Sequence, residues 1–316
     1  MKAIGGYFEL ELNVGTEYYQ NAIRLNTGRN ALEYILASKS YKKIYIPYFT
    51  CDVLLQPIKK LGIEYAFYHM NSQLEPVFDF DKIQSNEVFL YTNYFGQKDE
   101  FILELSKKNR NIIIDNAQSF YSRPLEGIDT FYSPRKFFGI PDGAYLFTNK
   151  KLNKKLEKDI SYTRFEHLTK RIDVSPEEGY SAFSKNDAAL DNQPILEMSN
   201  LTLRLLQSIN YDEIAQQRKS NYKFLESALQ SCNQFKLKIN DSQIAMVYPF
   251  WTKEKGLRKK LMEKRIYTAT YWPNVSEWTN KNMLEYNLME EVVYLPIDQR
   301  YNQSDLQKVV NFILTD

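Results

Sequence analysis

Cysteine and histidine are scarce in this chain of 316 residues, which contains two of each. Cys51 and Cys232 lie far apart in the sequence, so they form no metal-ligand spacing and could make at most one disulfide. Nothing in this pattern indicates a disulfide-rich secreted scaffold. Because His69 and His167 are the only histidines, a histidine-based metal site is not indicated either, and we expect no metal.

The chain also lacks an excess of charge and a long apolar run. Lysine and arginine total 41 against 39 acidic residues, and a formal net charge of +2 gives no electrostatic basis for binding nucleic acid or an anionic membrane. No stretch approaches the roughly 18 uninterrupted apolar residues of a membrane span, and the N-terminal sequence MKAIGGYFELEL has no apolar signal-peptide core. We therefore expect a cytoplasmic protein that binds neither nucleic acid nor membrane.

Aromatic residues, in contrast, are plentiful. They make up 15% of the chain, with 24 tyrosines and 19 phenylalanines, and hydrophobic residues make up 43%. Disordered chains lack such residues, so this chain is predicted to be globular. At roughly 150 residues per domain, its length predicts about two domains.

Helical and strand patterns alternate through the first half of the chain. Helices are predicted at 28–39, at 52–62 with a bend near Pro57, and at 99–109, and strands at 42–49, 63–70, 87–96, 111–118 and 144–149. This alternation predicts a largely parallel sheet that is covered by helices on both faces.

The second half has a different character. Residues 151–170 are predicted to be helical and 171–195 to be an irregular connector, because the latter contain Pro176, Gly179 and Pro194. A long helical pattern runs from 196 to about 231, and the remainder resembles a small α/β unit. We therefore expect one domain over 1–195 and a second over 196–316.

Asp115 is a candidate functional residue because it ends NIII, the most apolar predicted strand. Ligands of open α/β sheets bind beyond the carboxyl ends of the strands. A carboxylate there needs a cationic or hydrogen-bonding partner. The alternative is a helix cap or a structural ion pair.

Lys136 lies in an aromatic and glycine-bearing segment, DTFYSPRKFFGIPDGAYLFT. Partial desolvation there would favour the neutral amine that forms a Schiff base. The alternative is an ordinary lysine at the edge of a loop. Of the two neighbours, Arg135 is expected to be the more solvated.

A third candidate is Gly28 in TGRNALEY (27–34), where a loop passes into a helix. Backbone N–H groups at a helix start bind phosphate, and a glycine permits close approach. Alone the signal is weak, because most such glycines are turn residues, and the segment is neither a Walker A nor a G-x-G-x-x-G motif.

A phosphate-type helix start, then an acid at a strand end, then a lysine 21 positions later (115 to 136) is the order found in enzymes that use pyridoxal 5'-phosphate (PLP). The sequence resembles the DegT-type sugar aminotransferases, a divergent member within the fold-type I PLP enzymes, along nearly the whole chain. The specific matches are DNAQSF, close to the D-A-A-Q-S/A motif of that family, and SPRK with PDGAYLFT, similar to its lysine segment. The weaker matches are TGRNAL, IPYFTCDVL, TNYFG, SNLTLRLLQS, ATYWP and VVYLPID.

This resemblance implies a large PLP-binding domain with a mostly parallel seven-stranded sheet, plus a small C-terminal α/β domain. It implies that Lys136 holds PLP as a Schiff base and then moves the proton, that Asp115 pairs with the ring nitrogen, and that Gln118 bonds the ring 3-oxygen. The remaining cofactor-binding residues that it implies are Gly28, Arg29 and Asn30 around the phosphate, and Asn200 reaching the phosphate of the neighbouring subunit in a homodimer with shared active sites.

Three positions depart from the family pattern. Arg29 stands where the family has threonine, although an arginine can clamp phosphate. Phe131 replaces a phosphate-binding serine, for which Ser133 or Thr130 could substitute. Cys51 occupies the position of the aromatic residue that stacks on the ring, so Tyr48 or Phe49 could cover that face instead, and Tyr271 or Trp272 could line a sugar pocket.

The activity implied is transfer of an amino group, with L-glutamate as the expected donor, to a keto sugar linked to a nucleotide, in polysaccharide or secondary-metabolite biosynthesis. The presence of Lys136 argues against the dehydratase branch of the family, where this lysine is replaced. Two alternatives are open. The chain could be a PLP-fold protein with a sensing or assembly role, which the departures at Arg29, Phe131 and Cys51 motivate, or it could act on a carbonyl or amine that is not a sugar.

Overall fold

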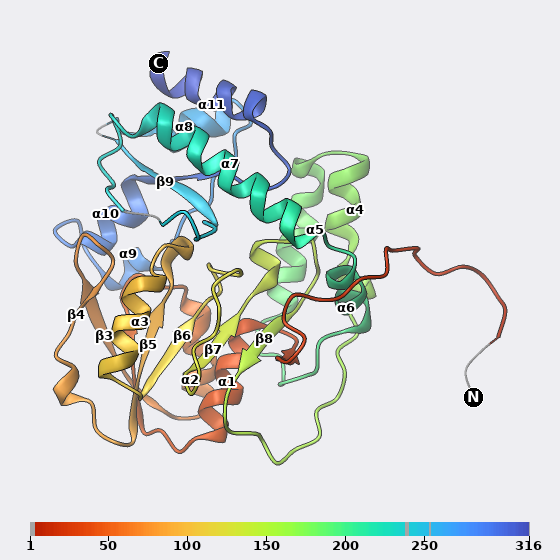
Figure 1. Ribbon diagram of the computed structural model, residues 1–316, viewed down its shortest axis with the longest axis vertical. Coiled ribbons are helices and arrows are strands. Elements are labelled where there is room, and N and C mark those ends of the chain that lie inside the picture. The colour runs from red at the N-terminus through yellow and green to blue at the C-terminus, as the bar shows by residue number, and fades with distance from the viewer. Residues whose placement is uncertain (1–3, 238–239, 253, 316) are drawn as a thin grey trace.

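The computed structural model describes residues 4–237, 240–252 and 254–315, and its centre is an eight-stranded sheet (Figure 1). The strand order is β1-β8-β7-β6-β5-β2-β3-β4. Neighbours from β7 through β3 pair in parallel, whereas β1, β8 and β4 pair antiparallel. The strands are β1 (Ile23–Leu25), β2 (Lys43–Pro47), β3 (Glu64–Met70), β4 (Pro76–Val77), β5 (Glu87–Thr92), β6 (Ile112–Asp115), β7 (Asp129–Tyr132) and β8 (Ala144–Phe147).

The predicted, mostly parallel sheet is thus confirmed, with one strand more than the seven expected. The sequence pattern placed β2, β3, β5, β6 and β8 and missed β1, β4 and β7. Of these, β4 is a two-residue edge strand that pairs with the end of β3 through His69 and Met70. A strand as short as β4 contains too few residues to show an alternating pattern, so no sequence pattern indicates it.

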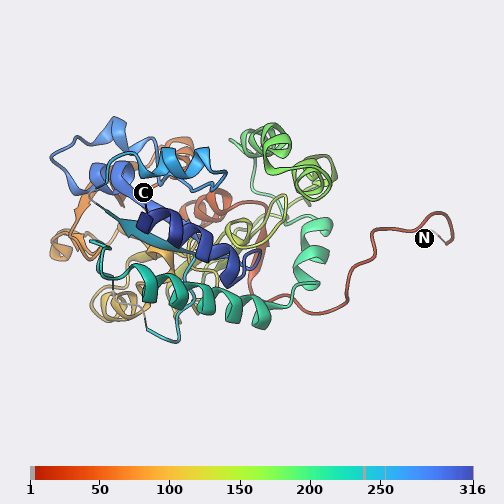
Figure 2. The ribbon, with the colours of Figure 1, turned by 90° about the horizontal axis from the view of Figure 1, so that it is seen from above.

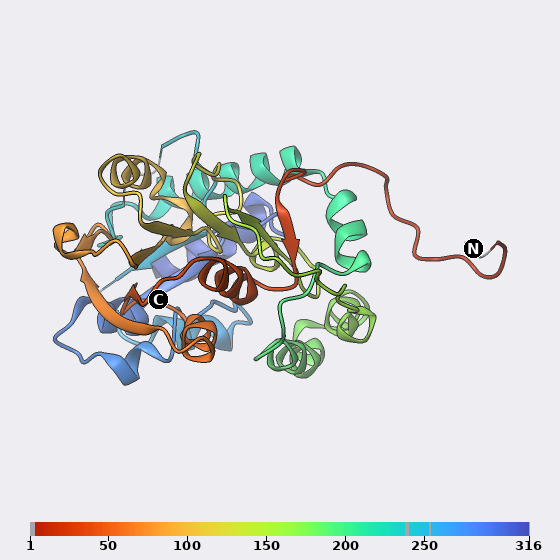
Figure 3. The ribbon, with the colours of Figure 1, turned by 90° about the horizontal axis from the view of Figure 1, so that it is seen from below.

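Helices cover both faces of the sheet, as predicted. Helices α1 (Gly28–Ser38) and α2 (Leu55–Lys60) lie on one face and α3 (Asp99–Lys108) lies on the other, as the view from below shows (Figure 3). Strand β5 illustrates the alternation of side chains: Val88 and Leu90 belong to the core cluster of α1 and α2, and Phe89 and Tyr91 to the cluster of α3. All four side chains are fully buried.

The C-terminal part forms the small α/β unit that the sequence predicts. Strands β9 (Val247–Trp251) and β10 (Val292–Pro296) pair antiparallel, and α7 (Tyr211–Leu229) and α11 (Gln303–Thr315) pack side by side across them (Figure 2). This unit has its own apolar core, to which α7, α8, β9, β10 and α11 contribute. The remaining helices are α8 (Leu257–Glu263), α9 (Val275–Trp278) and α10 (Leu284–Glu291). The expected boundary between 195 and 196 stays a prediction.

The region between the two parts corrects the sequence prediction. The structure has a helical hairpin, α4 (Glu166–Asp173) and α5 (Pro176–Ala189), where 151–170 was expected to be helical and 171–195 irregular. The proline and glycine that suggested an irregular segment are both compatible with this hairpin. Pro176 is the first residue of α5, a position where a missing N–H costs nothing, and the hydroxyl of Ser175 caps the helix. A Cβ on Gly179 would lie 3.2 Å from the carbonyl oxygen of His167, so glycine permits the close packing of the two helices.

The long helix expected over 196–231 is also two helices. Helix α6 (Asn200–Gln207) ends before a short turn, and α7 begins after Asn210. The side chain of Asn210 accepts a hydrogen bond from the backbone N–H of Glu213, which caps α7 and sets its new direction. The apolar periodicity continues across the turn, so the pattern alone did not reveal the break.

The N-terminal segment lies apart from the rest of the fold. Residues 4–16 form an extended segment that leaves the body of the molecule beside α6 (Figure 1). In the part of the chain that the structure describes, no helix combines the length and the apolar character needed to cross a bilayer.

Candidate active site

Asp115 lies where the sequence places it, at the carboxyl end of the buried parallel strand β6. Its side chain is buried, and its Oδ1 accepts a hydrogen bond of 2.8 Å from the backbone N–H of Ala117. Burial raises the pKa of Asp115, although the positive charge of Lys136 and the Ala117 N–H both act in the opposite direction. Among the described residues only this one N–H donates to the carboxylate, so the group lacks the close cationic partner that a buried charge requires.

Gln118, three residues after Asp115, presents a free hydrogen-bond donor. Its Oε1 accepts from the backbone N–H of Phe95 at 3.2 Å, which fixes the orientation of the amide. Its Nε2 is buried and has no partner within the described residues. The Phe95 N–H lies in a tight turn that requires glycine at position 96. Gly96 has a φ of 73°, and a Cβ added to it would lie 2.9 Å from the carbonyl oxygen of Ile244. The site therefore contains an amide donor that is oriented but unsatisfied.

Lys136 ends a short 3-10 turn that follows β7. Its Nζ lies 5.9 Å from the ring centre of Trp272. The positive charge of Lys136 acts to lower the pKa of Asp115 and of Cys51, but burial has the larger effect and both pKa values are raised. The structure thus brings the predicted Asp115, Lys136 and Cys51 together. It adds Trp272, which the sequence suggested only as a possible pocket residue.

The expected solvation of the two basic neighbours is reversed. Lys136 is exposed to solvent in this chain, whereas the side chain of Arg135 is only 16% exposed and forms an ion pair of 3.2 Å with Asp187. Helix α5 explains the difference, because it supplies Asp187 and covers Arg135. Since α5 was not predicted, the sequence could not indicate which of the two side chains it would cover.

The helix start at Gly28 lies beside the end of β7. A Cβ on Gly28 would lie 3.7 Å from the ring of Phe131 and 3.7 Å from the Cβ of Ser133. The hydroxyl of Thr27 caps the helix by accepting from the N–H of Asn30 at 3.1 Å. The backbone N–H groups of Gly28 and Arg29, in the first turn, have no partner within the helix and are available to an anion. Phe131 itself is buried in the core under α1, which accounts for an apolar residue at that position.

The side chains of Arg29 and Asn30 are engaged within the protein. Arg29 forms an ion pair with Asp191, and its Nη1 also donates to Gln56 at 3.3 Å. The Nδ2 of Asn30 donates to the carbonyl oxygen of Gln193 at 2.8 Å. Both side chains are therefore occupied within the described part of the chain, and the backbone N–H of Arg29, not that of Asn30, remains available to an anion.

The other predicted residues are placed as follows. Cys51 is partly buried, and burial raises the pKa of its thiol. Asn200, the first residue of α6, is exposed and accepts from the Nζ of Lys158 at 3.1 Å, so it is not gathered with the rest of the site in a single chain. Phe49 is fully buried and packs edge-on against Trp272 with 5.1 Å between ring centres, whereas Tyr48 stacks on Phe67.

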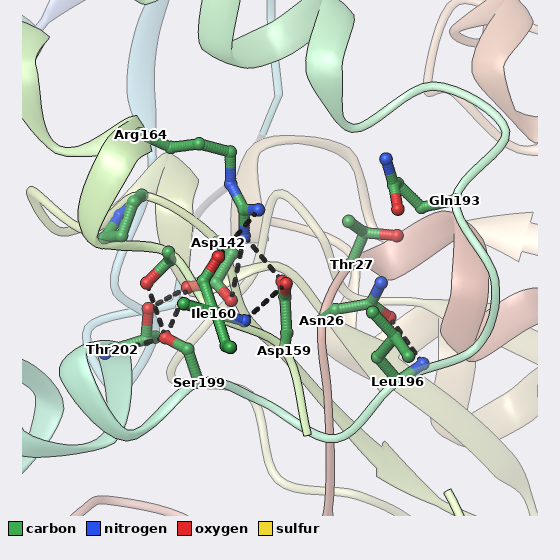
Figure 4. Close-up of polar contacts among 12 residues, drawn as sticks. Asn26, Thr27, Asp142, Asp159, Ile160, Arg164, Gln193, Leu196, Ser199 and Thr202 are labelled. Atoms are coloured by element: carbon green, nitrogen blue, oxygen red, sulfur yellow. Dashed lines mark hydrogen bonds and ion pairs between the residues drawn. The ribbon is translucent and has the colours of Figure 1, made fainter. Parts of the chain in front are cut away.

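Figure 4 shows a polar cluster that the sequence did not reveal, in which Asp142, Asp159, Arg164, Ser199 and Thr202 converge. Asp142 is fully buried and accepts hydrogen bonds from the hydroxyls of Ser199 and Thr202. The Nη2 of Arg164 lies 3.6 Å from Asp142 and 2.6 Å from Asp159. Burial, together with the neighbouring Asp159, raises the pKa of Asp142 to about 7.

The cluster is connected to the helix start through the backbone. Gly143, next to Asp142, donates its N–H to the carbonyl oxygen of Asn26 at 2.6 Å, and the side chain of Asn26 accepts from the N–H of Leu196. The cluster thus fixes the strand that leads into Gly28. Its members come from separate segments, and no local pattern connects them in the sequence.

Ionisation of Asp142 should cost stability. Because its pKa in the folded state lies above that of an unfolded aspartate, the folded state is favoured at low pH and loses stability as the pH rises from about 4 to about 7. D142N keeps an oxygen for Ser199 and supplies a permanent donor to Asp159. We expect its Tm to exceed that of the wild type by about 2–4 °C near pH 8 and to differ little near pH 4, as measured by circular dichroism. An equal difference at both pH values would contradict this explanation.

No protein-family model and no curated protein matches this sequence. Solved structures do match its fold. DesV from S. venezuelae, in complex with a ketimine intermediate, is 16% identical, with a TM-score of 0.65 over 92% of this chain and 83% of DesV. Spr1654 from Streptococcus pneumoniae in its PLP form, provisionally classed as a sugar aminotransferase, is 14% identical, with a TM-score of 0.63 over 92% of this chain and 84% of Spr1654. A DegT DnrJ EryC1 StrS aminotransferase from Brucella abortus is 14% identical, with a TM-score of 0.58 over 93% of this chain and 85% of that enzyme.

These likenesses show the fold. The chain has the fold-type I architecture of these enzymes, a large mostly parallel sheet flanked by helices with a small α/β unit after it. The resemblance that the sequence suggested is therefore confirmed at the level of the fold, over more than nine-tenths of the chain.

Proposed function

We propose that this chain is a PLP-dependent aminotransferase of the DegT type, which transfers an amino group from L-glutamate to a keto sugar linked to a nucleotide. The observation that carries the proposal is the convergence of Asp115, Gln118 and Lys136 at the carboxyl end of the sheet, in the fold of sugar aminotransferases. The resemblance of the sequence to this family implies the same three side chains.

The residues present fit the cofactor. Asp115 is a buried carboxylate that no described residue pairs with as a close cation, and the protonated ring nitrogen of PLP would supply one. The unpartnered Nε2 of Gln118 would donate to the ring oxygen. Ser133 and the backbone N–H groups of Gly28 and Arg29 would hold the phosphate. When bound, PLP supplies an electron sink for the carbon that carries the amine.

The chain's own residues then have separate tasks. Lys136 would attach the cofactor through its amine and, once released, move the proton at the reacting carbon as a general base and acid. Asp115 would keep the ring nitrogen protonated through its negative charge. Trp272, near the amine of Lys136, would limit the access of water from that side.

The first prediction concerns the complete first half-reaction. With PLP added, the purified protein should show a visible absorbance band, which excess L-glutamate should replace by absorption at shorter wavelength. K136A should show neither change, because it lacks the amine that attaches the cofactor. A band that does not respond to glutamate would favour another donor or the sensing role. The absence of a band in folded protein would refute the proposal.

A second prediction concerns the Gln118 donor. Q118A removes the hydrogen bond to the ring oxygen and should raise the Kd for PLP about tenfold. Gln97 is a buried glutamine at the same edge of the sheet, so Q97A is a matched control that should leave the Kd unchanged. Fluorescence titration of both variants measures the two constants, and equal affinities would show that Gln118 does not touch the cofactor.

We also propose that the chain acts as a cytoplasmic homodimer with shared active sites, in which Asn200 reaches the partner's phosphate. Lys136 is exposed in the single chain, so the site is open on one side. Large apolar side chains are exposed on the N-terminal segment, such as Tyr7 at 99% and Phe8 at 91%, and on the α4–α5 hairpin, such as Ile172 at 83%. Exposed apolar groups of this kind are typical of a protein interface.

A third prediction tests this assembly. The double variant Y7S/F8S should raise the dimer dissociation constant at least about tenfold, because aromatic anchors carry much of the energy of an interface. L314S removes an exposed apolar side chain on α11, away from that segment, and should have no effect. Sedimentation velocity distinguishes the results, and a wild-type monomer at micromolar concentration would contradict the proposal.

A further inference from the structure

The segment 4–14 has the sequence pattern of a strand, but its apolar side is not covered by the described part of its own chain. Apolar residues alternate with polar ones at Phe8, Leu10, Leu12 and Val14. This is the period of a half-buried strand. Phe8, Leu10 and Val14 are exposed, and none of them belongs to an apolar core. Exposed apolar side chains in this regular order indicate a segment that packs against another molecule.

The direction of the segment also points away from its own chain. Its base is fixed beside α6, where a Cβ on Gly15 would lie 2.7 Å from the carbonyl oxygen of Gln207, so glycine permits the close approach. Beyond this base the segment runs away from the body of the molecule in all three views (Figures 1, 2 and 3). Fully extended, residues 4–14 span roughly 35 Å, which is long enough to reach a neighbouring subunit.

A second exposed apolar surface lies at the cavity beside Lys136. This cavity has a volume of about 640 Å³ and is enclosed by the 135–140 loop, the α4–α5 hairpin, α7 and residues 298–300. Ile172, Tyr180 and Phe183 of the hairpin line the cavity and are nevertheless exposed, so they form its open edge. An apolar edge of this kind suits an apolar segment from another subunit.

The lining of the cavity is strongly cationic. It contains one carboxylate, Asp298, and five cations: Arg135, Lys136, Arg171, Arg218 and Arg300. Arg135 and Arg300 have ion-pair partners, and the charge of Asp298 also acts on Arg218. Arg171 is exposed beside the apolar edge and forms no ion pair of 4 Å or less with any described residue. The open edge of the cavity therefore presents a positive charge that is free to pair with a carboxylate.

We propose that segment 4–14 of one copy docks on the open edge of this cavity in a second copy. Phe8 and Leu10 pack on the exposed apolar side chains of the hairpin, and Glu9 and Glu11 lie near Arg171. Both acids are exposed, and Glu9 makes only a long contact of 3.9 Å within its own chain. In a two-fold dimer each copy thereby closes the site of the other. The identity of that site rests on the proposed function.

Photo-cross-linking tests where the segment lies. A chain with Phe8→p-benzoylphenylalanine is prepared in an unlabelled and an isotope-labelled form, and the two are mixed without PLP and irradiated. We expect a covalent dimer in which the segment of one isotope form is joined to residues 165–183 of the other. Leu314→p-benzoylphenylalanine is the matched control, because Leu314 is also a large exposed apolar residue but lies on α11. The control should give no cross-link to residues 165–183.

Charge reversal tests the pairing with Arg171. R171E should lower the cross-linking yield at least about tenfold, because like charges then face each other. The triple variant E9K/E11K/R171E restores opposite charges and should recover most of the yield. The proposal is overturned by a cross-link within one chain, by one to another part of the partner, by the absence of any cross-link, by a normal yield in R171E or by no recovery in the triple variant. Because no PLP is present, such a failure is distinct from failure of the proposed function, which the absorbance change with PLP and glutamate tests.

Discussion

The site depends on one interaction that the described residues do not complete: the buried carboxylate of Asp115 has no close cation among them. The hydrophobic strand β6 that ends at Asp115 forces this group to the carboxyl end of the sheet and out of solvent. Strands β5 and β7 flank it in parallel register, with Thr92 opposite it on one side and Phe131 on the other. Burial of an unpaired charge opposes folding, so the arrangement is understandable only if a cationic group occupies the space in front of it.

Gln118 and the helix start at Gly28 also have hydrogen-bonding groups that a ligand would satisfy. Gln118, three residues after Asp115, has a buried Nε2 without a partner among the described residues, and the helix start at Gly28 lies beside Ser133. A planar cation that carries an oxygen acceptor on the ring and a phosphate at one end satisfies all three. The buried Asp142 cluster holds the strand before Gly28 in place through hydrogen bonds. Its role is therefore structural, whereas Asp115, Gln118 and Lys136 carry the proposed chemistry.

Much of this could be predicted from the sequence, because the strongest signals are local. The apolar run before Asp115, the DNAQSF segment and the SPRK segment each identify a residue at the end of a strand, and parallel pairing brings strand ends together. Long-range features could not be predicted in the same way. The helix α5 that covers Arg135, the cluster around Asp142 and the buried position of Arg218 all depend on segments far apart in the chain. Pro176 and Gly179 make this segment look irregular, because a proline that starts a helix and a glycine that lets two helices pack closely resemble helix breakers in a sequence.

The central claim is that Lys136 is the residue that attaches the cofactor. The most direct measurement is reduction of the PLP-treated protein with borohydride, followed by digestion and mass spectrometry of the peptides. A single pyridoxyl-modified residue, Lys136, is expected, with no modification at that site in the untreated protein. Modification of another lysine in place of Lys136, or no modification of folded protein, would contradict it.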